Sequence, residues 1–273
     1  MTGGTAGAAP RPPARVGGRQ LLRGHHGTLA ALLDANTFRH LDRLGVAAGQ
    51  RCWEVGAGGA TVPAWLARRT GPAGHVLATD TDLTFLQEAD GLAFEIARHD
   101  IGADPAPPGA FDLVHARLVL EHVPGRDAAL ATMVRALRPE GWLLVESGDP
   151  RLQPLACPDE AGSAEELANR LRNACWALQS RRTDLGYGRT LPRRLRSAGL
   201  TEIGAEASFP LAGPAAARLQ RTMVERARDR LTATGMATTE EIDQHLADID
   251  AGRLDLTAFP VVSAWGRKGA DNP

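Results

Sequence analysis

Short apolar runs alternate with longer stretches of helical periodicity between residue 50 and about residue 147. The apolar runs predict strands at 51–55, 75–79, 93–99, 111–116 and 141–146, with helices at 60–69, 83–89 and 127–137 between them. Strands that are separated by helices form parallel βαβ units. This region therefore predicts an α/β fold with a doubly wound, mostly parallel sheet.

The flanking regions are more helical. Residues 20–45, 163–181, 214–234 and 238–249 have the apolar spacing of helices, residues 186–198 suggest a turn and a short helix, and 200–209 and 256–265 suggest two more strands. The helices at 20–45 and 160–183 are not needed to build the sheet. We expect them to form a helical lid over its ligand-binding edge.

These patterns divide the 273 residues into five parts. We expect a disordered tail at 1–19, which is rich in Gly, Ala, Pro and Arg, and lid helices at 20–45. A ligand-binding core at 46–150, a lid insertion at 151–185 and the remainder of the fold at 186–273 complete the chain.

Composition narrows the functional class. The 31 basic and 32 acidic residues nearly cancel, whereas nucleic-acid binders usually carry a basic excess. No apolar run approaches the roughly 18 residues that span a bilayer, and residues 1–19 lack the apolar segment of a secretory signal. Three widely spaced cysteines do not suggest a disulfide framework. We expect a cytoplasmic protein that binds neither nucleic acid nor membrane.

A glycine-rich segment, C-W-E-V-G-A-G-G-A at 52–60, joins the first strand to the first helix of the core. A dinucleotide fingerprint would require glycine at position 61, where the chain has Thr61. Glu54 would repel a pyrophosphate but would attract an ammonium group. A ligand with an α-ammonium and a sulfonium but no phosphate fits both facts. The segment therefore predicts a binding site for S-adenosylmethionine (SAM), in which Glu54, Gly56, Ala57 and Gly58 contact the ligand.

Two further acids follow the next strands. Asp80 ends the second strand, 24 residues after Gly56, where a carboxylate can accept hydrogen bonds from both ribose hydroxyls. Asp100 follows the third strand and could accept a hydrogen bond from the adenine amine. Because parallel strands end at one edge of a sheet, we expect both acids beside the glycine turn.

Together these motifs resemble the class I SAM-dependent methyltransferases, in particular the methyltransferase type 11 or UbiE-like group. The matching motifs are E-x-G-x-G at 54–58, V-L-A-T-D at 76–80, H-D-I at 99–101, F-D-L-V at 111–114, L-E-H-V-P at 120–124 and L-R-P-E-G-W-L-L-V-E at 137–146. Two positions depart from the family pattern, since Ala60 replaces its third motif glycine and Glu140 replaces the first glycine of a P-G-G turn.

The resemblance covers about residues 46–150 and implies a seven-stranded sheet with an antiparallel last strand. It also implies SAM as the methyl donor, S-adenosylhomocysteine as the product, and further cofactor contacts at Thr81, Ile101 and Ala116. Lid helices of this group often pack across a two-fold axis, so the resemblance is also compatible with a homodimer.

Three residues are candidates for accepting a proton from the substrate. His122 follows the fourth strand, near the expected methyl group, and an unperturbed histidine pKa of about 6.5 suits a general base. His26 lies in the expected lid, and Tyr187 lies in a glycine-flanked loop that we expect at the mouth of the pocket. The chain has no HExxH motif and no closely spaced His/Cys cluster, so we expect no metal site.

The preferred function is methyl transfer by in-line displacement to a small, largely uncharged acceptor. An aromatic or indole-type secondary metabolite is one such acceptor, methylated at oxygen, nitrogen or carbon. Two alternatives stay open: a nicotinamide-dependent oxidoreductase, and a SAM-binding fold with a role other than methylation. Thr61 and the scarcity of Tyr and Lys argue against the oxidoreductase.

Overall fold

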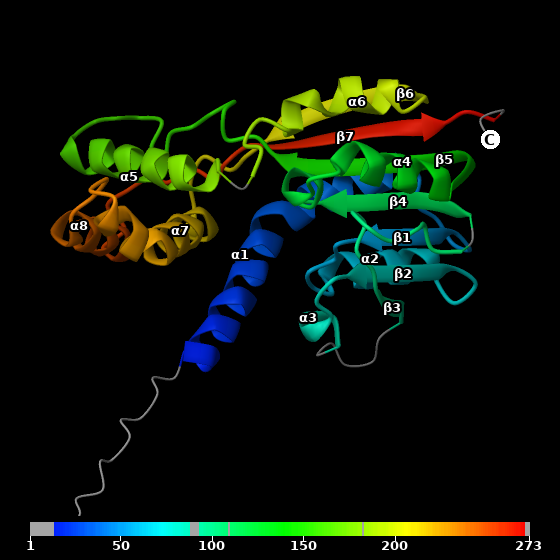
Figure 1. Ribbon diagram of the computed structural model, residues 1–273, viewed down its shortest axis with the longest axis horizontal. Coiled ribbons are helices and arrows are strands. Elements are labelled where there is room, and N and C mark those ends of the chain that lie inside the picture. Colours follow the sequence, from blue (N-terminus) through cyan, green and yellow to red (C-terminus); the bar gives the residue numbers. More distant parts are fainter. Residues whose placement is uncertain (1–13, 88–92, 109, 182, 271–273) are drawn as a thin grey trace, which may run out of the picture.

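A seven-stranded mixed sheet forms the centre of the molecule (Figure 1). The computed structural model describes residues 14–87, 93–108, 110–181 and 183–270. The strand order is β3-β2-β1-β4-β5-β7-β6, and β7 alone runs antiparallel to its neighbours. The strands are β1 (Arg51–Val55), β2 (His75–Asp80), β3 (Glu95–Arg98), β4 (Phe111–Arg117), β5 (Leu137–Gly148), β6 (Leu200–Ser208) and β7 (Val261–Lys268). The predicted fold class is confirmed.

Helices cover both faces of this sheet, and further helices lie beyond its edge. The α-helices are α1 (Ala14–Arg43), α2 (Thr61–Thr70), α3 (Thr84–Gln87), α4 (Arg126–Ala136), α5 (Ser163–Gln179), α6 (Leu191–Ser197), α7 (Pro214–Ala233) and α8 (Thr239–Asp250). Short 3-10 helices span Leu120–His122 and Gly188–Thr190. Within the described residues, no helix is both long enough and apolar enough to cross a membrane.

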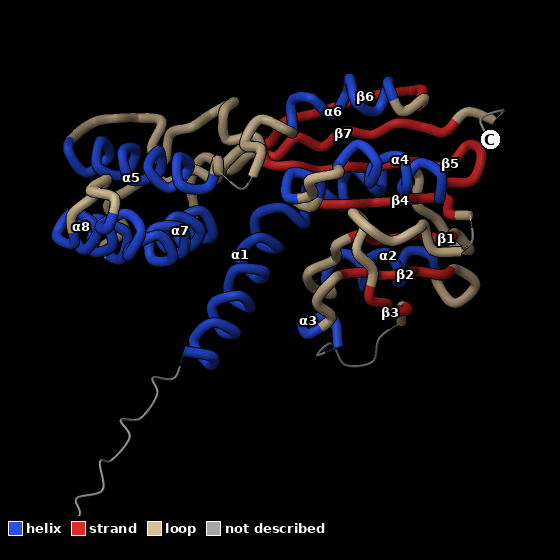
Figure 2. The backbone as a smooth tube through the Cα atoms, viewed as in Figure 1, coloured by secondary structure: helices blue, strands red, loops and turns tan. Residues whose placement is uncertain are grey.

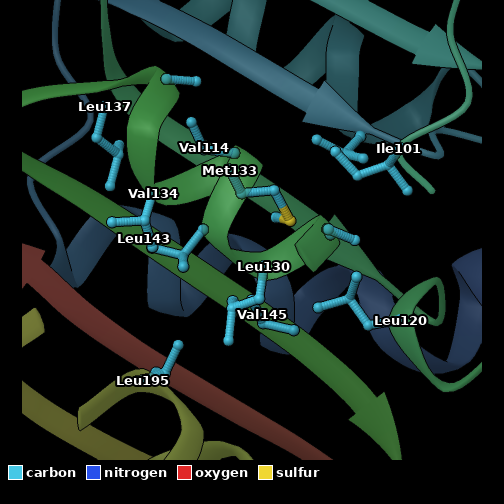
Figure 3. Close-up of a cluster of buried hydrophobic side chains, with 14 of the residues drawn as sticks. Ile101, Val114, Leu120, Leu130, Met133, Val134, Leu137, Leu143, Val145 and Leu195 are labelled. Atoms are coloured by element: carbon cyan, nitrogen blue, oxygen red, sulfur yellow. The ribbon is translucent and has the colours of Figure 1, made fainter. Parts of the chain in front are cut away.

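One face of the sheet packs on α4 and α6. Figure 3 shows Leu130, Met133 and Val134 of α4 against Val114 and Val145 of the central strands. These side chains are buried because strand side chains alternate between the two faces, while every third or fourth residue of a helix faces the sheet. This apolar core holds the carboxyl ends of β4 and β5 in place.

The opposite face packs on α2 and on the second half of α1. Leu41 of α1 and Leu66 of α2 lie in one buried cluster with Cys52, Leu113 and Leu144 of the strands. Since successive strand residues face opposite ways, the even-numbered residues of β1 and the odd-numbered residues of β4 share this face. The polar side chains among them lie under α1.

Helices α5, α7 and α8 form a separate layer beyond the sheet, which we call the helical cap (Figures 1 and 2). Their apolar faces form a core of their own, which includes Leu171, Leu219 and Ile242. Helices α7 and α8 lie between β6 and β7 in the sequence and pack on α5. Periodicity identified these helices but could not identify their partner.

Three elements begin four or more residues from their predicted start. Strand β5 begins at Leu137 rather than at residue 141. Helix α1 begins at Ala14, so residues 14–19 are helical although we expected them in a disordered tail, while the rest of that tail, 1–13, lies outside the described residues. Strand β7 begins at Val261 rather than at residue 256. Residues Leu256 and Ala258 are apolar because they pack against the helical cap, not because they pair with β5.

Candidate functional site

The turn after β1 presents its backbone to a cavity. Gly56 and Gly58 have φ angles of 62° and 61°, which favour glycine. A Cβ atom on Gly56 would lie 2.4 Å from Cγ2 of Val119. The amide of Gly58 donates a 2.8 Å hydrogen bond to Oδ2 of Asp80, which joins the turn to the end of β2.

The cavity beside this turn has a volume of about 690 Å³. Its lining includes seven of the predicted cofactor residues, namely Gly56, Ala57, Gly58, Asp80, Thr81, Asp100 and Ile101. We call it the nucleoside cavity. The acids that the sequence placed at the ends of β2 and β3 therefore do lie beside the glycine turn.

The nucleoside cavity fits the groups of SAM. Both carboxylates are oriented by backbone amides: Asp80 accepts from Asp82 at 3.0 Å, and Asp100 accepts from Gly102 at 2.8 Å. A carboxylate offers about four lone-pair sites, so each retains capacity for ligand hydroxyl or amino groups. Phe85 and Val119 add apolar wall, as a purine requires.

Glu54 does not line this cavity, and its contact with the cofactor stays a prediction. Its side chain is 2% exposed, and its Oε2 atom lies 2.6 Å from Nδ1 of His115. Glu54 shares the α1 face of the sheet with Cys52, whereas the glycine turn begins two residues later. An internal cation therefore compensates the charge that we had assigned to a ligand.

His115 lies between two carboxylates in a buried polar layer under α1. Its Nε2 atom lies 3.3 Å from Oε2 of Glu146. The carboxylate of Glu146 also accepts hydrogen bonds from the hydroxyl of Thr37, at Oε2, and from that of Ser263, at Oε1 and 2.5 Å. Burial alone would lower the pKa of His115, but the attraction of Glu54 and the hydrogen bonds to both carboxylates raise it to about 9. The imidazole is therefore positively charged at neutral pH.

The pKa of Glu146 is lowered, as expected for a carboxylate paired with a charged His115. Burial would raise it, but the hydrogen bond and charge of His115 lower it to about 2. We did not identify His115 or Glu146 from the sequence. The available signal was the position of polar residues at 54, 115 and 146 within otherwise apolar strands.

Arg117 and Ala116 end β4 in different environments. Arg117 forms a 2.8 Å ion pair with Asp34 of α1, donates to Thr37 at 2.9 Å, and lines the nucleoside cavity. Ala116 points to the opposite face and is buried in the core with Leu120. Its side chain therefore faces α4 rather than the nucleoside cavity.

A second cavity, of about 530 Å³, lies between α1, α5, α7 and the sheet edge. Its wall is largely apolar and includes Trp176, Leu178, Met223 and Phe259. We call it the acceptor cavity. Trp176 of α5 lies here and packs edge-on against Phe259, with ring centroids 5.7 Å apart.

The two cavities share four lining residues: His26, Leu29, Leu118 and His122. Leu118 has a φ of 58°, which is unusual for a leucine, and its amide donates to the carbonyl of Glu146 at 2.8 Å. Such backbone conformations are concentrated at functional sites. The junction between the cavities is thus built from α1 and from the segment that follows β4.

Both predicted histidines lie at this junction. Nδ1 of His122 lies 3.2 Å from Oγ1 of Thr183, and the tautomer of the ring decides which of them donates. Burial lowers the pKa of His26, although Asp80 and Asp82 act in the opposite direction, so His26 is neutral at neutral pH. Each ring therefore has a position from which it could accept a proton.

Tyr187 lies away from both cavities, and its expected place at the pocket mouth is wrong. The ring is fully buried, with the guanidinium groups of Arg126 and Arg194 5.1 and 4.9 Å from its centroid. Burial raises the pKa of the phenol to about 12. Gly186 and Gly188 suggested a loose loop, but Gly188 instead packs closely against β5, where an added Cβ would lie 2.9 Å from the carbonyl oxygen of Ser147.

The described residues contain no group of three or more His, Cys, Asp or Glu side chains arranged to hold a metal ion. The three cysteines are buried and free.

Comparison with known proteins agrees with the motifs. Residues 53–145 match the family model described as a methyltransferase domain. The ubiquinone/menaquinone biosynthesis C-methyltransferase UbiE of Vibrio parahaemolyticus is 31% identical over 125 residues, which are 42% of this chain and 48% of that protein. Methyltransferase str3 of Strobilurus tenacellus is also 31% identical over 125 residues, 44% of each chain. The chain thus spans about half the length of these curated relatives.

Solved structures share the fold at low identity. A Haemonchus contortus phosphoethanolamine N-methyltransferase 2, solved with S-adenosylhomocysteine, has a TM-score of 0.53 at 17% identity and covers 86% of this chain and 52% of its own. YcgJ of Bacillus subtilis has a TM-score of 0.53 at 15% identity, with 90% and 99% coverage. The [4+2]-cyclase SpnF has a TM-score of 0.52 at 18% identity, with 86% and 80% coverage.

The motifs, the strand order and the matched segment agree with one another. The resemblance to the class I SAM-dependent methyltransferases is therefore confirmed, and it rests on residues 53–145, which match the methyltransferase domain model.

Proposed function

We propose that the chain transfers a methyl group from SAM to a small-molecule acceptor held in the acceptor cavity. The observation that carries this proposal is the meeting of the two cavities at His26, Leu29, Leu118 and His122. A methyl donor on one side of this junction and an acceptor on the other would face each other directly, as an in-line displacement requires.

The residues of the nucleoside cavity would hold SAM, whose sulfonium supplies an activated methyl group. The backbone of Gly56 and Gly58 lets the ligand approach closely, Asp80 would accept hydrogen bonds from the ribose hydroxyls, and Asp100 would accept one from the adenine amine. These roles are supported by the orientation of both carboxylates through backbone amides.

The histidines at the junction would serve an acceptor that loses a proton on methylation. The ring of His26 or of His122 would accept that proton if the nucleophile is a hydroxyl or an amine. A carbon nucleophile would depend mainly on orientation against the walls of the acceptor cavity. The near balance of charge in the chain favours a small molecule over a nucleic acid.

Calorimetric titration with SAM, S-adenosylhomocysteine and NADH tests the cofactor. We expect binding of the first two and none of NADH, which would separate this proposal from a nicotinamide-dependent oxidoreductase. Asp80→Asn should weaken the binding of both SAM-type ligands, whereas Asp229→Asn, at an exposed position on α7, should not.

Formation of S-adenosylhomocysteine in the presence of candidate acceptors tests the transfer itself. SAM binding without turnover of any acceptor would instead favour a role other than methylation. Binding of NADH in preference to SAM would refute the proposed function.

A further inference from the structure

One side of helix α7 faces the acceptor cavity. The lining residues of this helix include Leu219 and Met223, four residues apart, and Thr222, Arg226 and Arg230, also at intervals of four. Residues at this spacing lie above one another on a helix surface. The helix therefore presents an apolar stripe and, beside it, a polar stripe that carries two guanidinium groups.

Arg226 differs from its neighbours because it has no partner. Arg221 pairs with Glu225 at 3.0 Å, Arg228 pairs with Asp243 at 2.7 Å, and Arg230 donates to the carbonyl of Leu178 at 3.1 Å. Within the part of the chain that the structure describes, Arg226 makes no hydrogen bond or ion pair. Its charge faces the acceptor cavity without an internal counter-ion.

The carboxyl groups of the cavity do not compensate this charge. Glu121 and Asp184 are the acidic residues in its lining. Glu121 accepts a hydrogen bond from the amide of Gly148 at 3.2 Å, and Asp184 pairs with Arg126 at 3.0 Å, so neither carboxylate is paired with Arg226. The cavity therefore has an excess of positive charge on its α7 side.

His25 of α1 provides a second polar group there. It lines the same cavity, and its buried Nδ1 atom has no hydrogen-bond partner among the described residues. Burial, Arg226 and His26 together lower its pKa to about 4, so the ring is neutral and Arg226 is near enough to act on it. In one tautomer, Nδ1 would donate a hydrogen bond to an anion that also contacts Arg226.

We propose that Arg226 and His25 form an anion subsite in the acceptor cavity, and that the methyl acceptor is an aromatic carboxylate. The aromatic part is inferred from the edge-on rings of Trp176 and Phe259 in the same wall. Arg230 is already held by the carbonyl of Leu178, which leaves the guanidinium of Arg226 as the donor of this stripe for a ligand, and a single guanidinium matches the single charge of a carboxylate. This inference rests on the proposed function and replaces the uncharged acceptor that we expected from the sequence.

Three probes of similar size test the subsite: phenylacetate, phenylacetamide and phenyl phosphate. Each is titrated into protein saturated with S-adenosylhomocysteine, and binding is followed by the NMR signals of the histidine rings. We expect phenylacetate to bind about tenfold more tightly than the neutral amide, as for a charge-assisted hydrogen bond at a partly exposed site. Its binding should also raise the pKa of His25, because an anion offsets the charge of Arg226.

The variants are Arg226→Gln and, as a matched control on the same helix, Arg218→Gln. Arg218 is also exposed, but it does not line the cavity. Arg226→Gln should remove the preference for the carboxylate and should leave the affinity for S-adenosylhomocysteine unchanged. Arg218→Gln should keep both properties of the wild type.

The outcomes separate the two proposals. Failure to bind S-adenosylhomocysteine, measured first, would refute the proposed function. With that binding intact, the anion subsite is refuted by equal affinities for acid and amide, by binding of neither, or by a preference that survives Arg226→Gln. Tighter binding of phenyl phosphate than of phenylacetate would refute the assignment to a carboxylate.

Discussion

Nδ1 of His115 lies 2.6 Å from Oε2 of Glu54 in a layer that neither solvent nor the nucleoside cavity reaches. Glu54, the acid of the E-x-G-x-G motif, thus has another side chain of the protein as its partner. Through Glu146, the same histidine is linked to Thr37 of α1. The interaction joins the strand that carries the glycine turn to the helix that carries His26.

This buried layer predicts how stability depends on pH. The folded-state pKa of His115 is about 9, above its ordinary value of 6.5, so its contribution is complete below about pH 6.5 and is lost as the pH rises through about 9. We expect the free energy of unfolding in urea to fall on the order of 1–3 kcal/mol over this range. His115→Gln should be less stable at pH 6 and should show a smaller fall. Equal slopes for both proteins would contradict this prediction.

The stability of the buried layer is limited at acid pH by the protonation of Glu146. Its pKa of about 2 is below the ordinary value, so its contribution is present above about pH 4.5 and is lost as the pH falls through about 2.

Gly56→Ala tests the glycine turn. The new Cβ would lie 2.4 Å from Val119 at a φ of 62°, so the turn must shift and the nucleoside cavity must change shape. We expect a loss of at least about tenfold in SAM affinity and of about 1–2 kcal/mol in stability. Gly125→Ala is the control, since Gly125 has a φ of −88°, lines neither cavity, and has no atom within 4 Å of its added Cβ. Similar losses in both variants would show that the shape of the turn is not the cause.

Substitution of each junction histidine by Asn tests proton transfer. If the acceptor loses a proton, removal of the base should lower kcat by roughly 10²–10⁴-fold while leaving the Kd of SAM nearly unchanged. A base at His26 would also place the acid limb of the kcat profile below pH 6.5, because the pKa of that ring is lowered. If His26→Asn and His122→Asn both retain full kcat, neither ring is the base.

Glu140→Gly should stabilise the protein. Glu140 has a φ of 66°, where glycine is favoured by about 1 kcal/mol, and the family pattern has glycine at this position. Its exposed ion pair with Arg267, 2.8 Å long, contributes less than that. Glu140→Ala loses the ion pair but keeps the unfavourable φ, so only the glycine variant should raise Tm. A lower Tm for Glu140→Gly would show that the ion pair dominates.

The sequence predicted the core of the fold because its strands and helices have clear and different periodicities. Six of the seven strands begin within about four residues of their predicted start, and Asp80 and Asp100 lie where the ends of parallel strands must meet. His122, predicted from its place after the fourth strand, and His26, predicted from its place in a lid helix, line the same two cavities although they are 96 positions apart in the chain.

The remaining errors concern the directions and partners of side chains. Position along a strand predicted that Glu54 would be near the glycine turn, but not that it faces α1. Tyr187 was placed in a loose loop on the basis of two glycines, one of which packs against a strand. The partner of α7 depends on tertiary packing, so Arg226 could not be assigned to a cavity before the structure was known.

Helix α1 contributes to both the buried layer and the cavity junction. His26 and Thr37 are eleven residues apart, which is close to three whole turns at 3.6 residues per turn, so they project in nearly the same direction. One residue inserted between them would rotate His26 by about 100° relative to Thr37. The number of residues between His26 and Thr37 therefore fixes the direction in which the histidine projects. An insertion or deletion would keep His26 at the junction only if it added or removed a whole number of helical turns.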